Sequence, residues 1–216
     1  MINSYPKISI VTPSFNQGLF IEHTILSVLD QKYPNLEYII IDGGSTDNTI
    51  SILKKYESEL TWVSESDNGM YDAINKGFRM CSGEILAWIN SDDIYYAGSF
   101  SLVSNIFAQF ADIDWITGKC GYVDEKGNLT RIAKSKLYNK ELLENGFYRS
   151  PFSYVVNQNV VFWRKKLWEK SGGCNPRFKQ AGDFELWTKF AKYAKLYYID
   201  FVFSAFRKHS NQKTSI

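Results

Sequence analysis

The feature that most constrains the fold is an alternation of short apolar segments with longer amphipathic ones over roughly the first 90 residues. The apolar segments, predicted as strands, are 7–11, 36–41, 61–64 and 84–90. The segments between them, predicted as helices, are 19–29, 47–56 and 70–80. Strands that alternate with helices form a parallel sheet with right-handed crossovers. We therefore expect an α/β fold with a mostly parallel central sheet and helices on both faces.

The rest of the chain follows a less regular pattern. We expect strands within 114–131 and at 159–163 and 196–203, helices at 97–110, 164–170 and 183–193, and a loop with a short helix at 134–150. Neither a linker nor a repeat interrupts this pattern, so the sequence predicts a single domain over 1–216.

Cysteine usage and hydropathy point to a compartment. Cys81, Cys120 and Cys174 are far apart and form no CxxC pair, which favours a reducing environment over a disulfide framework. The N-terminus has no apolar signal core, and no apolar run approaches the ~20 residues that span a bilayer. We expect a cytoplasmic protein, with possible peripheral association at the inner face of the plasma membrane.

Charge is divided unevenly along the chain. Residues 1–130 hold 8 Lys and Arg against 17 Asp and Glu, whereas residues 131–216 hold 17 against 6. An acidic half suits a metal ion, and a basic half suits phosphates or an anionic membrane surface. The alternative is a solvated surface with uneven charge.

Polar residues follow three of the predicted strands. Pro13 and Phe15 come after the first, Asp42 after the second, and Asp92 and Asp93 after the fourth. Ligands of open α/β sheets bind outside the carboxyl ends of the strands, so we expect these side chains to converge. Two adjacent carboxylates can hold Mg²⁺ or Mn²⁺ while a diphosphate and water complete its shell. Alternatively, one of the pair caps the next helix, and Asp42 belongs to an ordinary turn.

Five ordered motifs together resemble the inverting glycosyltransferase family 2, which has the GT-A fold, and in particular a bacterial surface-polysaccharide branch. They lie at 10–16 (IVTPSFN), 39–47 (IIIDGGSTD), 66–77 (SDNGMYDAINKG), 90–93 (NSDD) and 182–187 (GDFELW). The resemblance implies a nucleotide-sugar and metal-binding half at 1–110 and an acceptor-binding half at 111–216. Two departures are Gly43, where many relatives have a second aspartate, and Asn90, where a carboxylate is common.

The resemblance also implies roles for individual residues on the donor side. Pro13 and Phe15 would line the base pocket, Asp42 would help to hold the nucleoside, and Asp92 would lie near the ribose or bridging waters. Asp93 would ligate the divalent metal, Mn²⁺ or Mg²⁺. His209 would reach the metal or the diphosphate, unless it is simply an exposed histidine.

Further roles concern the phosphates, the reaction and the acceptor. Asp72 would border the nucleotide, unless it only stabilises a helix N-terminus, and Lys76 could approach the phosphates. Asp183 would be the general base. Gln158 and Trp187 could contact the acceptor, although the spacing of Trp187 also suits the core.

The expected function is transfer of a sugar from a nucleotide-sugar donor to a glycan or lipid-linked saccharide acceptor, with no nucleic-acid partner. One alternative is a sugar nucleotidyltransferase, which would need a glycine-rich phosphate loop that 12–18 lacks. Another is a non-catalytic nucleotide- or sugar-binding domain, against which Asp92, Asp93 and Asp183 argue. The enzyme hypothesis requires Asp93 and Asp183 to face the same cavity.

Overall fold

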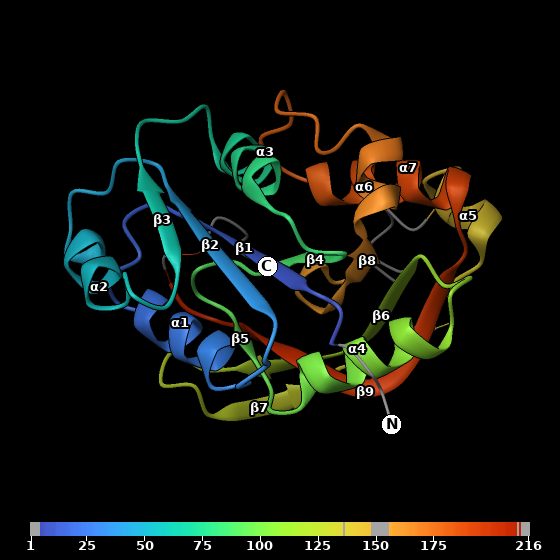
Figure 1. The fold of residues 1–216 in the computed structure, drawn as a ribbon, viewed down its shortest axis with the longest axis horizontal. Helices are drawn as coiled ribbons and strands as arrows, with labels where there is room; N and C mark the ends of the chain where they lie inside the picture. The colour runs from blue at the N-terminus through green and yellow to red at the C-terminus, as the bar shows by residue number, and fades with distance from the viewer. Residues whose placement is uncertain (1–4, 136, 148–155, 211, 213–216) are drawn as a thin grey trace.

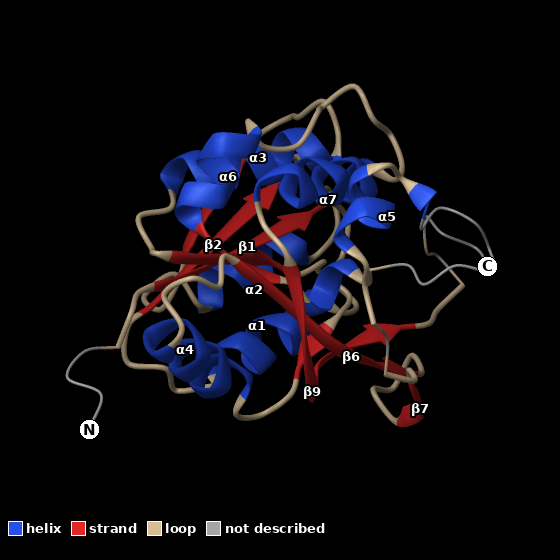
Figure 2. Ribbon diagram, turned by 90° about the vertical axis from the view of Figure 1, so that its right-hand side faces the viewer, coloured by secondary structure: helices blue, strands red, loops and turns tan. Residues whose placement is uncertain are grey.

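The computed structural model describes residues 5–135, 137–147, 156–210 and 212. In this part of the chain one sheet carries helices on both faces (Figure 1; Figure 2). The strands are β1 (Ile8–Ser14), β2 (Leu36–Asp42), β3 (Thr61–Ser64), β4 (Ile85–Trp88), β5 (Ile94–Tyr95), β6 (Trp115–Val123), β7 (Leu129–Ile132), β8 (Phe162–Arg164) and β9 (Leu196–Arg207). The helices are α1 (Ile21–Leu29), α2 (Thr49–Lys55), α3 (Met70–Met80), α4 (Ser99–Gln109), α5 (Lys140–Glu144), α6 (Lys165–Ser171) and α7 (Gly182–Tyr193).

The sheet runs in the order β3-β2-β1-β4-β8-β6-β9-β5, with β7 beside β6. Strands β3, β2, β1 and β4 are parallel to one another, whereas β8 is antiparallel to both β4 and β6. The chain moves outward from β1 to β3 and then returns to place β4 on the other side of β1. Loops that leave β1 and β4 therefore diverge, which opens a crevice at the carboxyl ends of these strands.

The first two strands are apolar because both faces of the sheet are covered there. All seven residues of β1 are buried. Figure 2 shows α3, α6 and α7 on one side of the sheet and α1, α2 and α4 on the other. Helix α3 packs closely on β1 at Gly77, where an added Cβ would lie 2.5 Å from Val11 Cγ1. A glycine here lets helix and strand approach each other.

An aromatic cluster joins the two halves of the sheet. The rings of Trp88 in β4 and Trp187 in α7 stack with their centroids 5.6 Å apart. Trp163 in β8 meets Trp88 edge-on at 5.5 Å, and Phe190 meets Trp163 at 5.6 Å. Such aromatic pairs add to the free energy gained by burial alone.

The later elements differ in part from those that the sequence predicted. A 3₁₀ helix at Gln158–Val160 includes the first two residues of the predicted strand at 159–163, and β8 begins only at Phe162. Strand β9 continues to Arg207 because it pairs with both β6 and β5 along this stretch. Within 134–150 the structure has α5, and residues 136 and 148–150 lie outside the described part.

Within the described ranges, every helix is too short or too polar to cross a bilayer.

The close contact at Gly77 can be tested by Gly77→Ala. Alanine is favoured over glycine by about 1 kcal/mol in an open helix. Here the added methyl group would press on Val11, and we expect a net loss of about 1–2 kcal/mol in the free energy of unfolding, measured with urea. Met80→Ala, at the exposed end of the same helix, is the control and should change it by less than about 0.5 kcal/mol. A Gly77→Ala variant more stable than the wild type would contradict a close contact between α3 and Val11 of β1.

Candidate active site

A cavity of about 1050 Å³ opens at the carboxyl ends of the parallel strands. This is at the upper end of the range for ligand pockets, ~300–1,000 Å³. Residues from five stretches contribute to its lining: 13–17, 66–71, 90–93, 156–159 and 179–183. The loops after β1 and β4 and the start of α7 thus line one cavity, which lies where the order of the strands reverses.

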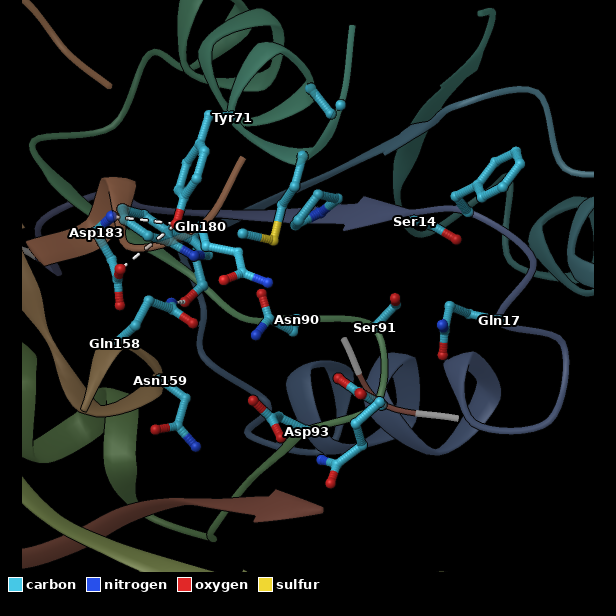
Figure 3. Close-up of a pocket in the computed structure, with 18 of the residues that line it drawn as sticks. Ser14, Gln17, Tyr71, Asn90, Ser91, Asp93, Gln158, Asn159, Gln180 and Asp183 are labelled. Carbon is cyan, nitrogen blue, oxygen red and sulfur yellow. Dashed lines mark hydrogen bonds between the residues drawn. The ribbon is translucent and has the colours of Figure 1, made fainter. Parts of the chain in front are cut away.

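Figure 3 shows how the polar side chains are distributed in this cavity. Asp183 and Gln158 lie at one end, Ser14 and Gln17 lie at the other, and Asp93 lies between them (Figure 3). Asp93 and Asp183 therefore face the same cavity, which is the condition that the enzyme hypothesis required.

Several buried polar atoms of the cavity lack a hydrogen-bond partner within the described part of the chain. They are Ser14 Oγ, Gln17 Oε1, Asn90 Oδ1, Asp93 Oδ2 and Asn159 Nδ2. Buried polar groups of folded proteins are nearly always paired. A polar ligand or ordered water in this cavity would supply the missing partners.

The carboxylates after β4 are held from several directions. Asp93 is fully buried, and its Oδ1 accepts a hydrogen bond from the Arg207 backbone N–H at 3.0 Å. Burial, together with the neighbouring charge of Asp92, raises the pKa of the Asp93 carboxyl well above its usual range. Asp92 Oδ2 lies 3.0 Å from His209 Nε2, and the His209 ring packs on Phe20 with centroids 4.4 Å apart.

These residues fit a divalent cation of the Mn²⁺ or Mg²⁺ kind in part. The described residues contain no cluster of three His, Cys, Asp or Glu side chains with the geometry of a complete metal site. Asp93 nevertheless lines the cavity, its Oδ2 has no hydrogen-bond partner among the described residues, and the Asp92 carboxylate is next to it. Carboxylate oxygens are the ligands that both ions accept, and a substrate diphosphate commonly completes the shell.

At the other end of the cavity, Tyr71 of α3 holds the first turn of α7. Its hydroxyl oxygen accepts hydrogen bonds from the Gly182 N–H at 2.8 Å and the Asp183 N–H at 3.3 Å, and it donates to Asp183 Oδ1 at 3.4 Å (Figure 3). Ala181, the residue before the helix, provides no side-chain cap. The tyrosine hydroxyl therefore performs the capping role from a distant helix.

The local chemistry of Asp183 suits a proton acceptor. Burial raises the pKa of its carboxyl above the usual value, although the hydrogen bonds from the Phe184 N–H and the Tyr71 hydroxyl lower it. The Tyr71 ring also needs Gly182, because a Cβ there would lie 2.7 Å from ring atoms.

Three other predicted site residues line the cavity. Pro13 and Phe15 lie at its β1 end, and the Phe15 side chain is half exposed. Gln158 lies near Asp183, where its amide donates to the Trp88 carbonyl oxygen at 2.5 Å.

Asp42 is fully buried and does not line the cavity. Its carboxylate accepts hydrogen bonds from the backbone N–H groups of Gly44 and Ser45 and from the hydroxyls of Ser45 and Ser64. These partners leave little capacity for a nucleoside. Asp42 thus shapes the loop after β2, and its expected part in holding the nucleoside stays a prediction.

Asp72, Lys76 and Trp187 also lie outside the cavity lining. Lys76 Nζ forms ion pairs with Glu65 at 2.9 Å and Asp72 at 3.5 Å. The ammonium group that could approach the phosphates is therefore already paired within the chain. The Trp187 side chain is fully buried among other aromatic rings, so it belongs to the core and is not placed to contact an acceptor.

Two residues that the sequence analysis did not single out support the site. Tyr71 lies within the 66–77 motif, but no local pattern links it to Asp183, which is 112 positions away. Arg207 ends the last strand, and its guanidinium is buried beside Asp92 and Asp93. A lone basic residue closing an apolar strand is the only signal that could have identified it.

Comparison with known proteins gives a family. Residues 9–170 match the family model for glycosyl transferase family 2. A glycosyltransferase of Rickettsia typhi, RT0329, is 29% identical over 99% of this chain and 68% of its own length. The chondroitin synthase of Escherichia coli is 24% identical over 87% of this chain and 27% of its own length.

Solved structures show the same fold. Residues 1–349 of S. aureus TarS in complex with UDP-GlcNAc match with a TM-score of 0.78 and 16% identity, over 97% of this chain and 62% of that one. The mannosyltransferase PcManGT from Pyrobaculum calidifontis, in complex with GDP-Man and Mn²⁺, matches with a TM-score of 0.69 and 20% identity, over 94% and 57%. The expected GT-A fold is confirmed. The chain spans about two thirds or less of each of these proteins.

The Tyr71 cap can be tested by Tyr71→Phe. Losing the hydroxyl leaves two N–H groups of α7 without their acceptor, and we expect a loss of about 1 kcal/mol in the free energy of unfolding, measured with urea. Tyr193→Phe, near the exposed end of the same helix, is the matched control and should have almost no effect. Equal midpoints for the two variants would show that the hydroxyl does not cap the helix.

Proposed function

Because this chain belongs to glycosyl transferase family 2, we propose that it is an inverting glycosyltransferase that moves a sugar from a nucleotide-diphosphate donor to a hydroxyl group of an acceptor glycan. The observation that supports this most directly is the placement of Asp93 and Asp183 along one cavity. Asp93 would bind near the donor diphosphate, and Asp183 would take a proton from the acceptor.

In this proposal Asp183 accepts the proton of the acceptor hydroxyl while that oxygen attacks the anomeric carbon. The nucleotide leaves from the opposite face of the sugar, so a single displacement inverts the anomeric centre. Tyr71 holds the start of α7 and thereby fixes where the carboxylate points. A positioned base of this kind contributes about 10²–10⁴-fold to the rate.

Asp93, with Asp92 beside it, would hold a divalent metal, and His209 would orient Asp92 through their hydrogen bond. A bound cation supplies electrostatic stabilisation of the departing diphosphate. Pro13 and Phe15 would contact the base at the far end of the cavity. The complexes of TarS with UDP-GlcNAc and of PcManGT with GDP-Man and Mn²⁺ support a nucleotide-sugar donor and a metal.

We also propose a role in bacterial polysaccharide synthesis, with a glycan or lipid-linked saccharide as acceptor and with work at the cytoplasmic face of a membrane. The likeness to a chondroitin synthase and the basic composition of residues 131–216 support this. Lys165, Lys166 and Lys170 on α6 already have partners within the chain, namely the Cys81 carbonyl, Asp114 and the Tyr193 ring. A membrane contact would therefore have to share those side chains or use others.

The role of Asp183 can be tested by Asp183→Asn. We expect transfer to fall by about 10²–10⁴-fold while donor binding, measured by calorimetry, is retained. Because the base acts in its ionised form, wild-type kcat/KM should fall as pH drops through the raised pKa of Asp183, above the usual ~3.9 for Asp. The kcat/KM of any transfer that remains in Asp183→Asn should not show this fall at low pH, which we call the acid limb.

Glu185→Gln, on the same helix turn and outside the cavity lining, is the matched control and should keep both activity and the acid limb. Wild-type turnover by Asp183→Asn would exclude Asp183 as the base.

Metal dependence can be tested by chelation. Dialysis against EDTA should lower transfer at least tenfold, and Mn²⁺ or Mg²⁺ should restore it. The rise in melting temperature caused by a nucleoside diphosphate should also require the cation, and Asp93→Asn should weaken that rise. Full activity and full thermal stabilisation in EDTA would contradict the metal role.

A further inference from the structure

At the β1 end of the cavity, the carboxylate of Asp67 occupies the space that a side chain at Gly43 would fill. An ideal Cβ built on Gly43 would lie 2.9 Å from Asp67 Oδ2 and 3.4 Å from Phe15 Cδ2. All three residues line the cavity. The Asp67 carboxylate and the edge of the Phe15 ring therefore occupy the space into which a side chain at position 43 would project, and they lie close to one another.

One oxygen of Asp67 is fixed and the other is available. Oδ1 accepts a hydrogen bond from the Gly69 N–H at 2.7 Å, which sets the orientation of the carboxylate. Gly69 has a φ of +110°, a conformation that favours glycine and that completes this tight turn. Within the described residues no hydrogen bond or ion pair engages Asp67 Oδ2. A ligand donor that enters beside the Phe15 ring can reach it.

Four backbone donors at this end are already used inside the protein. The Asn16 N–H donates to Ser45 Oγ at 2.7 Å, and the Gly43 N–H donates to the Ser14 carbonyl oxygen at 2.8 Å. The N–H groups of Gly44 and Ser45 both donate to Asp42. This end of the cavity thus offers an anionic acceptor beside an aromatic ring, while these four backbone donors are occupied.

We propose that Asp67 selects the base of the donor nucleotide, and that it favours bases whose ring carries an N–H on the hydrogen-bonding edge; this rests on the proposed glycosyltransferase function. Uracil, thymine and guanine carry such a donor. Cytosine and adenine present a ring nitrogen lone pair at the same place, which would face the carboxylate and be repelled. Phe15 supplies the flat surface against which the base packs.

Nucleotide binding without turnover tests this directly. Calorimetric titration should show that UDP binds the wild-type protein at least about tenfold more tightly than CDP, or GDP more tightly than ADP, because each pair differs at the ring N–H. Asp67→Asn keeps an oxygen for the Gly69 N–H but removes the charge and adds a donor. It should weaken binding of the preferred nucleotide about tenfold and narrow the discrimination within the pair.

Two further variants make the test specific. Glu65→Gln alters a neighbouring carboxylate that pairs with Lys76 outside the cavity, and it should leave the nucleotide preference unchanged. Gly43→Ala keeps Asp67 but would force its carboxylate to move, since the added Cβ would lie 2.9 Å from Oδ2. Gly43→Ala should weaken binding of the preferred nucleotide as Asp67→Asn does. It therefore provides a second test if Asp67→Asn folds poorly.

The outcomes separate this inference from the function on which it rests. Wild-type preference for CDP or ADP, or a preference that Asp67→Asn leaves intact, would overturn the role of Asp67 while leaving a glycosyltransferase in place. If no nucleoside diphosphate binds the wild-type protein with Mn²⁺ present, both the inference and the proposed function fail.

Discussion

The buried guanidinium of Arg207 joins the parts of the chain that surround Asp92 and Asp93. The residue is 1% exposed, and its Nε donates to the Asp92 carbonyl oxygen at 2.8 Å while its backbone N–H donates to Asp93 Oδ1. Nη1 donates to the Asp124 carbonyl oxygen in the β6–β7 turn, and Nη2 lies 2.8 Å from His23 Nδ1 in α1. Burial and the charge of Arg207 lower the pKa of His23, so its neutral ring accepts this bond. A buried cation needs such partners, and these fix the loop after β4 against β9.

The topology of the sheet explains why a loop held in this way can form a site. Strand order reverses between β1 and β4, so the loops after these strands separate and leave room for a ligand. Strand β8 then turns antiparallel beside β4, which brings the 3₁₀ helix at Gln158–Val160 and the start of α7 to the same opening. The end of the cavity at Ser14 and Gln17 therefore comes from the regular βαβ half, and the end at Gln158 and Asp183 from the irregular half.

This difference between the halves also decides what the sequence could predict. Strands β1 to β4 were predictable because their apolar runs and the intervening helices are local patterns. Long-range partners were not predictable: Asp42 is satisfied by Ser64, and Trp187 is buried because Trp88 and Trp163 lie against it. The same reason hid Tyr71, since only the fold reveals that its hydroxyl lies at the start of α7. Strand β5 has two residues and exists through its pairing with β9.

The cavity lining includes the buried Asp93 and the partly buried Asp183, and their neighbours suit them to different chemistry. Burial raises the pKa of both Asp93 and Asp183. Beside Asp93 stands a second carboxylate, Asp92, so the pair concentrates negative charge that a cation can balance. Asp183 has instead the hydroxyl of Tyr71 and the N–H groups of its own helix turn, which keep it ionisable without a counter-ion. The fold thus places a group able to hold a cation and a group able to take a proton along one cavity, and this separation is what a single displacement between donor and acceptor requires.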